Sequence, residues 1–359
     1  MRKVGATTFC VLLLILMVQS HGISMQSKNQ VEIDDSVFQY HSSKSISTGA
    51  LAWEWAQKVG GSSADDHSNA IAIDANGDVY VTGSFEQTAT FGSTTLSSAG
   101  DFDIFVAKMN STGHWLWAIQ AGGNHDDRGL DLAIDTSGNV FVTGKFQSTV
   151  QFGSDSLTAG PTANDDFFIA KADTWGNWLW VEGADCHNNG RCYGTSVAVD
   201  SAGYAYVTGS FTRDIDFGST TLTWAGVEDI FVAKIDTWGS WQWATMAGGA
   251  QGSDVPHSID IGPQGNAFIA GSFRFTSTFG TQSMTASGSS DVFIAKISQQ
   301  GDWLWAHDAG GTSSSGANSI RVDSQGNVFA AGSFYVGISF GNLTYSAGST
   351  ENSFIAKAN

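Results

Sequence analysis

The sequence repeats one short pattern five times. Gly-Ser-Phe, with Lys in place of Ser once, begins at regular intervals of 61 to 65 residues, at Gly83, Gly144, Gly209, Gly271 and Gly332. Each copy continues with Phe-Gly, at Phe91, Phe152, Phe217, Phe279 and Phe340, and with Ala-Lys, ending at Lys108, Lys171, Lys234, Lys296 and Lys357. A repeat of this length predicts an array or a closed ring, in which each unit buries its faces only against its neighbours.

One repeat contains four short stretches with the composition of β-strands. In the first copy they lie at 69–74, 79–85, 103–108 and 115–119, and an Asp-x-x-Gly segment joins the first two. Asp can bond the backbone of a tight turn, and Gly supplies its positive φ. Four antiparallel strands per repeat are typical of a propeller blade, so we expect an all-β fold.

The Trp-x-Trp strand shows how the ring would close. It occurs at Trp53, Trp115, Trp178, Trp241 and Trp303, and the last Ala-Lys strand is not followed by another copy. We therefore predict a five-bladed β-propeller of four-stranded blades, about 62 residues each, closed by the N-terminal Trp-x-Trp strand at residues 51–57. The alternative is an open arc that completes itself by dimerising.

These motifs resemble a known family. The segments Asp-x-x-Gly-Asn-Val-Phe-Val-Thr-Gly (135–144) and Asp-Ile-Phe-Val-Ala-Lys (103–108) look like the SBBP β-propeller repeat. The resemblance covers residues 51–359. It implies an exported or surface-associated microbial propeller, usually of unassigned function, and it brings no catalytic residues. Five repeats is fewer than the seven blades suggested by the family's usual name.

The N-terminus has the pattern of a secretory signal. Arg2 and Lys3 precede an apolar run of about 15 residues, too short to span a bilayer, and small residues follow at Ser20 and Gly22. We expect a signal peptide at 1–22, a flexible leader at 23–50 and the propeller at 51–359, with no transmembrane segment in the mature chain. The rivals are an uncleaved anchor and a packed segment around Val37 and Phe38.

Charge and cysteine use agree with export. The formal net charge of −18 argues against a nucleic-acid partner, because Lys and Arg supply that attraction. Cys10 lies in the apolar run, and Cys186 and Cys192 lie six residues apart in one loop. In an exported protein such a pair predicts a disulfide. The alternative makes Cys186, His187 and Cys192 metal ligands.

Candidate ligand-binding residues lie in the loops that lead from an outer strand to the next inner strand, which gather at one mouth of a propeller. These loops are 60–68, 122–129, 183–194, 248–257 and 310–318, and they vary most between repeats. Their polar residues are Asp65, Asp66, His67, His125, Asp126, Asp127, Arg128, Asp185, His187, Arg191, Asp254 and His257. Converging carboxylates and imidazoles would suit a sugar or a divalent cation. The alternative is five independent solvated loops.

Two other groups of residues recur or stand out in the repeats. An aspartate precedes four of the five Ala-Lys strands, at Asp103, Asp166, Asp229 and Asp291, and Asn352 precedes the last. Recurrence in successive blades indicates a structural hydrogen-bonding role. Trp175, Trp224 and Trp238 fall outside the Trp-x-Trp pattern, so they are candidates for stacking on sugar rings.

The sequence therefore predicts a monomeric, secreted or surface-associated, non-catalytic binding propeller with an extracellular glycan or protein as its ligand. No cofactor is expected, although the loops leave room for a divalent cation. Two alternatives stay open: a glycoside hydrolase-like enzyme using mouth carboxylates, and a structural envelope or matrix protein.

Overall fold

The computed structural model describes residues 53–61, 64–160 and 164–359. The predicted signal peptide and leader lie outside the described residues. The described part belongs to one compact unit, Trp53–Asn359. Within it, none of the helices has the length and apolar character needed to cross a membrane.

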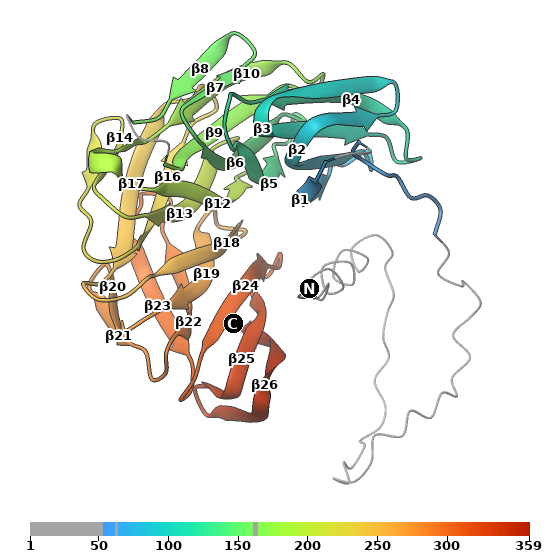
Figure 1. Ribbon diagram of the computed structural model, residues 1–359. Helices are drawn as coiled ribbons and strands as arrows, with labels where there is room; N and C mark the ends of the chain where they lie inside the picture. The colour runs from blue at the N-terminus through green and yellow to red at the C-terminus, as the bar shows by residue number, and fades with distance from the viewer. Residues whose placement is uncertain (1–52, 62–63, 161–163) are drawn as a thin grey trace, which may run out of the picture. The chain divides into compact units, whose positions relative to one another are not determined.

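Three antiparallel sheets of four strands, and a six-stranded sheet whose first four strands follow the same order, confirm the predicted four-stranded blade (Figure 1). A fifth sheet in the series has three strands. The first sheet contains β1 (Asp66–Ile73), β2 (Val79–Phe91), β3 (Thr94–Met109) and β4 (Trp115–Ala121). The second contains β5 (Arg128–Ile134), β6 (Val140–Phe146), β9 (Asp166–Ala172) and β10 (Trp178–Gly183). The third contains β12 (Cys192–Val199), β13 (Ala205–Phe211), β16 (Asp229–Ile235) and β17 (Trp241–Gly248). The fourth contains β18 (Val255–Ile261), β19 (Ala267–Phe273), β22 (Asp291–Ile297) and β23 (Trp303–Ala309). The fifth contains β24 (Ser315–Val322), β25 (Val328–Phe340) and β26 (Leu343–Ala358).

A small extra hairpin follows the second strand of each sheet. In three repeats the hairpin strands are distinct from the long strands of the blade. They are β7 (Thr149–Phe152) with β8 (Asp155–Thr158), β14 (Ile215–Phe217) with β15 (Thr220–Leu222), and β20 (Thr276–Phe279) with β21 (Gln282–Thr285). In the first and fifth sheets the hairpin is continuous with the long strands β2, β3, β25 and β26. Each hairpin reaches back to the outer strand before it, through pairs such as Gly122 with Gln151 and Gly248 with Thr278. The hairpins therefore link neighbouring sheets.

The hydrophobic core lies between consecutive sheets. The inner strands β1, β5, β12, β18 and β24 pack against one another in that order. Four buried clusters fill the spaces between neighbours; one, for example, joins Val106 of the first sheet to Leu132 and Phe168 of the second. Because both faces of a middle sheet are covered in this way, its strands are apolar on both sides rather than alternating.

Asp-x-x-Gly turns define one end of the sheets. Asp135 Oδ1 accepts hydrogen bonds from the backbone N–H of Ser137 and Asn139, both at 2.9 Å, and Gly138 has a φ of 81°. We call this the turn end, and we call the opposite end, where the outer-to-inner loops lie, the loop end. The predicted turn chemistry is confirmed.

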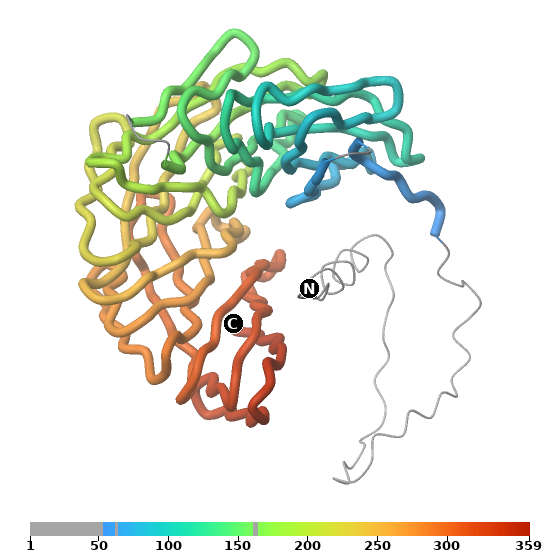
Figure 2. The backbone as a smooth tube through the Cα atoms, viewed as in Figure 1, coloured from blue at the N-terminus to red at the C-terminus, as the bar shows by residue number. Residues whose placement is uncertain are grey.

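The first and fifth sheets leave apolar side chains uncovered at the two ends of the series. Ile71 on β1 is 51% exposed, whereas its equivalents in the other sheets are at most 5% exposed. Ile355 on β26 is 70% exposed, although the equivalent Val106 and Val232 are fully buried. Trp53–Lys58 forms no strand, and β26 is an edge of its sheet, so the predicted closing pair is not formed here. Figure 2 shows Trp53–Gly61, in blue, running along the first sheet.

Candidate functional site at the loop end

Three of the predicted ligands occupy the same place in their repeats and anchor the loops. Asp66 Oδ2 accepts the Gly61 N–H at 2.9 Å, and Asp127 Oδ2 accepts the Gly123 N–H at 2.7 Å. Asp254 Oδ1 accepts from the Arg274 N–H and from the Ser277 hydroxyl. Asp127 and Asp254 are fully buried, so their carboxylates face the protein rather than a ligand in solution.

Burial raises the pKa of the Asp127 and Asp254 carboxyls. The pKa of Asp127 rises to about 7, and nearby Asp103 and Asp126 add to the effect by like-charge repulsion. Burial also raises the pKa of Asp103 and Asp254 to about 6. Asp103 Oδ2 accepts the Ala99 N–H at 3.0 Å and thereby holds the extra hairpin. The recurring aspartates are therefore structural, as predicted.

The loop of residues 183–194 has no aspartate at the anchoring position. Cys192 stands where the neighbouring loops have Asp127 and Asp254, and its Sγ lies 3.9 Å from Asp166 Oδ1. The predicted disulfide between Cys186 and Cys192 is formed. Both sulfurs are thus committed to each other, which leaves no thiolate for a metal.

A network of charged side chains joins two of the predicted loops. Arg128 Nε lies 2.8 Å from Asp126 Oδ1, and Lys145 Nζ lies 3.4 Å from Asp126 Oδ2. The same lysine lies 3.1 Å from Asp165 Oδ1, and Arg191 Nη2 lies 3.7 Å from Asp165 Oδ2. We call Asp126, Arg128, Lys145, Asp165 and Arg191 the charged strip.

Aromatic groups extend the charged strip over the neighbouring sheets. The Arg128 guanidinium lies 4.3 Å from the centre of the Phe102 ring, which in turn lies 5.5 Å from the His67 ring. On the other side, the Tyr193 hydroxyl donates to Glu228 Oε1 at 2.7 Å. Partly exposed cationic, anionic and aromatic groups thus run across three consecutive sheets at the loop end.

Sequence reasoning missed Lys145 and Asp165, the residues that connect the loops. Lys145 is the one exception to Ser in the repeated Gly-Ser-Phe motif. Its equivalents Ser84 and Ser210 are fully buried, whereas Lys145 reaches the surface and bridges two carboxylates. Lys145 could therefore have been found from the sequence, as a charged residue at a position that is serine in the other repeats.

The four predicted histidines lie in four different loops and form no common centre among the described residues. His67 and His257 are exposed, and His125 is half-buried. Of the four, His187 alone belongs to a group with metal-ligand spacing, together with Asp185 and Asp216. A hydrogen bond to Asp216 raises the pKa of His187. Asp65 is exposed in its loop.

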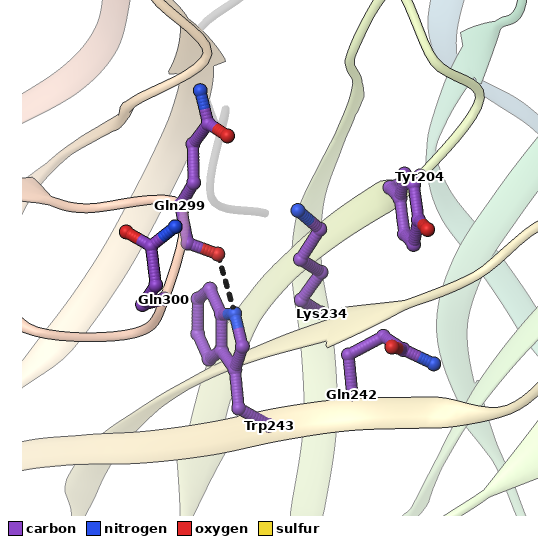
Figure 3. A pocket seen from close by; sticks show the side chains of 6 residues that line it. All are labelled: Tyr204, Lys234, Gln242, Trp243, Gln299 and Gln300. Carbon is purple, nitrogen blue, oxygen red and sulfur yellow. Dashed lines mark hydrogen bonds between the residues drawn. The ribbon is translucent and has the colours of Figure 1, made fainter.

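The turn end carries a shallow hollow and two exposed tryptophans. The hollow, of about 320 Å³, is lined by Tyr204, Lys234, Gln242, Trp243, Gln299 and Gln300 (Figure 3). Trp243 Nε1 donates there to the Gln299 carbonyl at 2.9 Å, a bond repeated by Trp117 and Trp180 at other junctions. Trp175 and Trp238 are 75% and 79% exposed, whereas Trp224 is half-buried beneath Arg213.

Comparison with known proteins agrees with the fold. The model of the family described as "SBBP: Beta-propeller repeat" matches residues 54–84. Residues 54–84 are therefore similar to one SBBP β-propeller repeat. Three further sets of four antiparallel strands in the same order follow the first sheet, so the same architecture continues beyond the matched segment.

Two curated relatives are much longer proteins. An uncharacterized WD repeat-containing protein of Acanthamoeba polyphaga mimivirus is 24% identical over 75% of this chain and 24% of its own length. The regulatory protein FlaEY of Caulobacter vibrioides is 26% identical over 68% of this chain and 26% of its own length. The chain thus spans about a quarter of the length of each relative. A solved structure of a protein of unknown function from Bacteroides caccae covers 65% of this chain and 63% of that one, at 12% identity and a TM-score of 0.35.

Proposed function

We propose that this SBBP-repeat protein is a non-catalytic binding propeller whose loop end recognises an extracellular protein. The charged strip is the observation that carries the proposal. It presents arginine, lysine and carboxylate groups, flanked by Phe102 and Tyr193, on a rigid sheet scaffold. Arginine and aromatic residues are enriched in the central residues of protein interfaces. The WD repeat-containing relative supports the same class of function.

The geometry of the charged strip favours a macromolecule over a small substrate. Its side chains are partly exposed and already hold one another in place, so little conformational entropy is lost on binding. Asp127, whose carboxyl has a raised pKa, is fully buried and bonded to backbone amides. Nothing in this arrangement favours the hydrolase alternative.

Export is part of the proposal. The Cys186–Cys192 disulfide supports an oxidising compartment, because such bonds persist outside the cytosol. The apolar N-terminal run with its basic start supports the same location. We therefore place the mature protein in the medium or at the cell surface, as a monomer.

Closure of the five sheets into a ring is also proposed, with Trp53–Val59 as the fourth strand of the fifth sheet. This segment already contacts the first sheet as an outer strand of the preceding blade would. Trp55 Nε1 donates to the Ser111 carbonyl at 3.1 Å, as Trp117 does to Thr174 at the next junction. Gly60 bridges Thr90 in the same way that Gly122 bridges Gln151. Pairing with β26 would cover both Ile71 and Ile355.

The binding proposal is tested by site-specific photo-crosslinking in extracellular fractions of the producing organism. A crosslinking amino acid at His125 in the secreted protein should capture a defined protein, in competition with unlabelled protein, whereas one at Gln300 on the turn end should not. Removing a central arginine from an interface typically costs at least about 1.4 kcal/mol, so Arg128→Ser should weaken binding about tenfold or more. Arg274→Ser, an exposed loop-end arginine outside the charged strip, is the matched control. Capture only from the turn end, or unchanged binding by Arg128→Ser, would refute the proposal.

A carbohydrate ligand is the second candidate, and it belongs to the turn end. Trp175 and Trp238 occupy equivalent turns of the second and third sheets and expose most of their rings. Exposed tryptophan faces stack well on sugar rings. Binding on a glycan array that is lost in Trp175→Ala and Trp238→Ala, but kept in Arg128→Ser, would support this candidate over the charged strip.

A further inference from the structure

An imidazole and two carboxylates converge at the disulfide-bonded loop. They come from β11 (Asp185–Cys186), from the short 3₁₀ helix η1 (His187–Asn189) and from β14. One ligand atom of each of Asp185, His187 and Asp216 lies within 4.8 Å of the others. His187 Nε2 lies 2.8 Å from Asp216 Oδ2. Nitrogen and oxygen donors at this separation can share one ion.

The backbone fixes this arrangement from two sides. β11 pairs with β14, which sets Asp185 directly opposite Asp216. The His187 N–H donates to the Asp214 carbonyl at 2.9 Å, and the Cys186–Cys192 disulfide closes the loop around the histidine. Asp216 Oδ1 accepts from the Thr221 hydroxyl, which orients its carboxylate. The three donors are therefore largely preorganised.

The cross-strand pair of aspartates is a second and independent indication of a cation. At the corresponding contacts of three other junctions, an uncharged hairpin residue faces a glycine: Gln151, Thr278 and Ser339 face Gly122, Gly248 and Gly310. Here two carboxylates face each other. Like charges placed directly opposite destabilise a strand pair. A bound cation converts that repulsion into attraction.

We propose that Asp185, His187 and Asp216 bind one divalent transition-metal ion, with Zn²⁺ as the best fit. Imidazole suits Zn²⁺, whereas Ca²⁺ and Mg²⁺ prefer oxygen ligands alone. The ion would replace the hydrogen bond between His187 and Asp216. Three protein ligands leave a fourth coordination position open. Asp185 and His187 also line a hollow of about 440 Å³, together with Gly160, Asn188 and Asn189.

The test is isothermal titration of the secreted, disulfide-intact protein with ZnCl₂ in the presence of excess Ca²⁺ and Mg²⁺. We expect one saturable equivalent. Losing one of three protein ligands should weaken the affinity by at least about tenfold in both His187→Ala and Asp185→Asn. His125→Ala, which removes a histidine from a neighbouring loop, should leave the affinity unchanged.

Spectroscopy separates a specific site from diffuse binding to an acidic surface. Cu²⁺ bound at this site should show nitrogen hyperfine coupling in its electron paramagnetic resonance spectrum, and His187→Ala should abolish that coupling. Asp185 is exposed, so Asp185→Asn tests the site without removing a buried group. Absence of a saturable Zn²⁺ equivalent, or wild-type affinity in both His187→Ala and Asp185→Asn, would overturn the proposal. The outcome does not depend on which partner the charged strip binds.

Discussion

The two ends of the sheets differ in what they repeat. At the turn end, Asp74, Asp135, Asp200 and Asp323 each accept the same pair of backbone hydrogen bonds. At the loop end, equivalent positions hold Asp127 in one junction, Cys192 in the next and Ser315 in the last. The turn end keeps its aspartate in four of the five repeats, whereas the loop-end position holds aspartate in three repeats, cysteine in one and serine in one.

This difference separates scaffold from recognition. A group needed in every blade contributes to folding, because each blade must form the same turn and bury the same faces. A group found once, such as Lys145 or the Cys186–Cys192 disulfide, is free to serve a single ligand. Substitutions at the turn end should therefore lower stability most, and those in the charged strip should change binding with little loss of stability.

The largest loss should come from Asp135→Ala at the turn end. The change removes the turn's hydrogen-bond acceptor and leaves the buried Lys171 ammonium, 3.6 Å from Asp135 Oδ2, without its carboxylate. Breaking a buried pair from one side costs about 3 kcal/mol or more of unfolding free energy. Denaturant unfolding should show this loss. Asp173→Ala, an equivalent turn cap with no lysine partner among the described ion pairs, should lose only about 1 kcal/mol.

Stability should fall as the pH rises from 5 to 8. Burial raises the pKa of Asp127 from 3.8 to about 7, so the folded state keeps a proton that the unfolded chain has lost. Stability from such a group is fully present below the unfolded pKa of 3.8 and is lost as the pH rises to the folded value, with about 3 kcal/mol of the loss falling above pH 5. Asp127→Asn should flatten the profile of unfolding free energy against pH. A profile that instead rises steadily to pH 8 would contradict the assignment.

Removing the disulfide should lower the unfolding free energy less than Asp135→Ala does. The double change Cys186→Ser and Cys192→Ser opens a short loop, for which the chain-entropy account gives a loss of roughly 2 kcal/mol. Thermal or denaturant unfolding under oxidising conditions measures it. An unchanged stability would show that the loop is held by β11 and β14 alone.

The smallest stability effect should follow Lys145→Ser, which restores the residue found in the other four repeats. Asp165 keeps the Gln147 amide at 2.8 Å and Arg191 at 3.7 Å, so no carboxylate is left without a partner. We expect a change below about 1 kcal/mol, as for other partly exposed ion pairs. A loss as large as that of Asp135→Ala would place Lys145 in the scaffold rather than in the recognition surface.

Periodicity made the blade predictable, because strand, turn and glycine positions recur at one spacing. The site was predictable only in outline. The loops were identified, but through-space pairing decides which residues meet, and Lys145 and Asp165 lie outside the loops that were singled out. Burial also turned Asp127 and Asp254 from candidate ligands into loop anchors, which composition alone does not reveal.

A designed disulfide tests the central claim, a five-bladed ring closed by Trp53–Val59, most directly. The register of β3 with β4 pairs Ala107 with Ala118, and the same register would pair Ala356 with Ala56. Ala56→Cys with Ala356→Cys should therefore form an intramolecular disulfide in the monomer, as efficiently as the control pair Ala107→Cys with Ala118→Cys. Mass spectrometry of the non-reduced monomer would identify the bond. Free thiols at both positions, or a disulfide found only between two chains, would contradict closure.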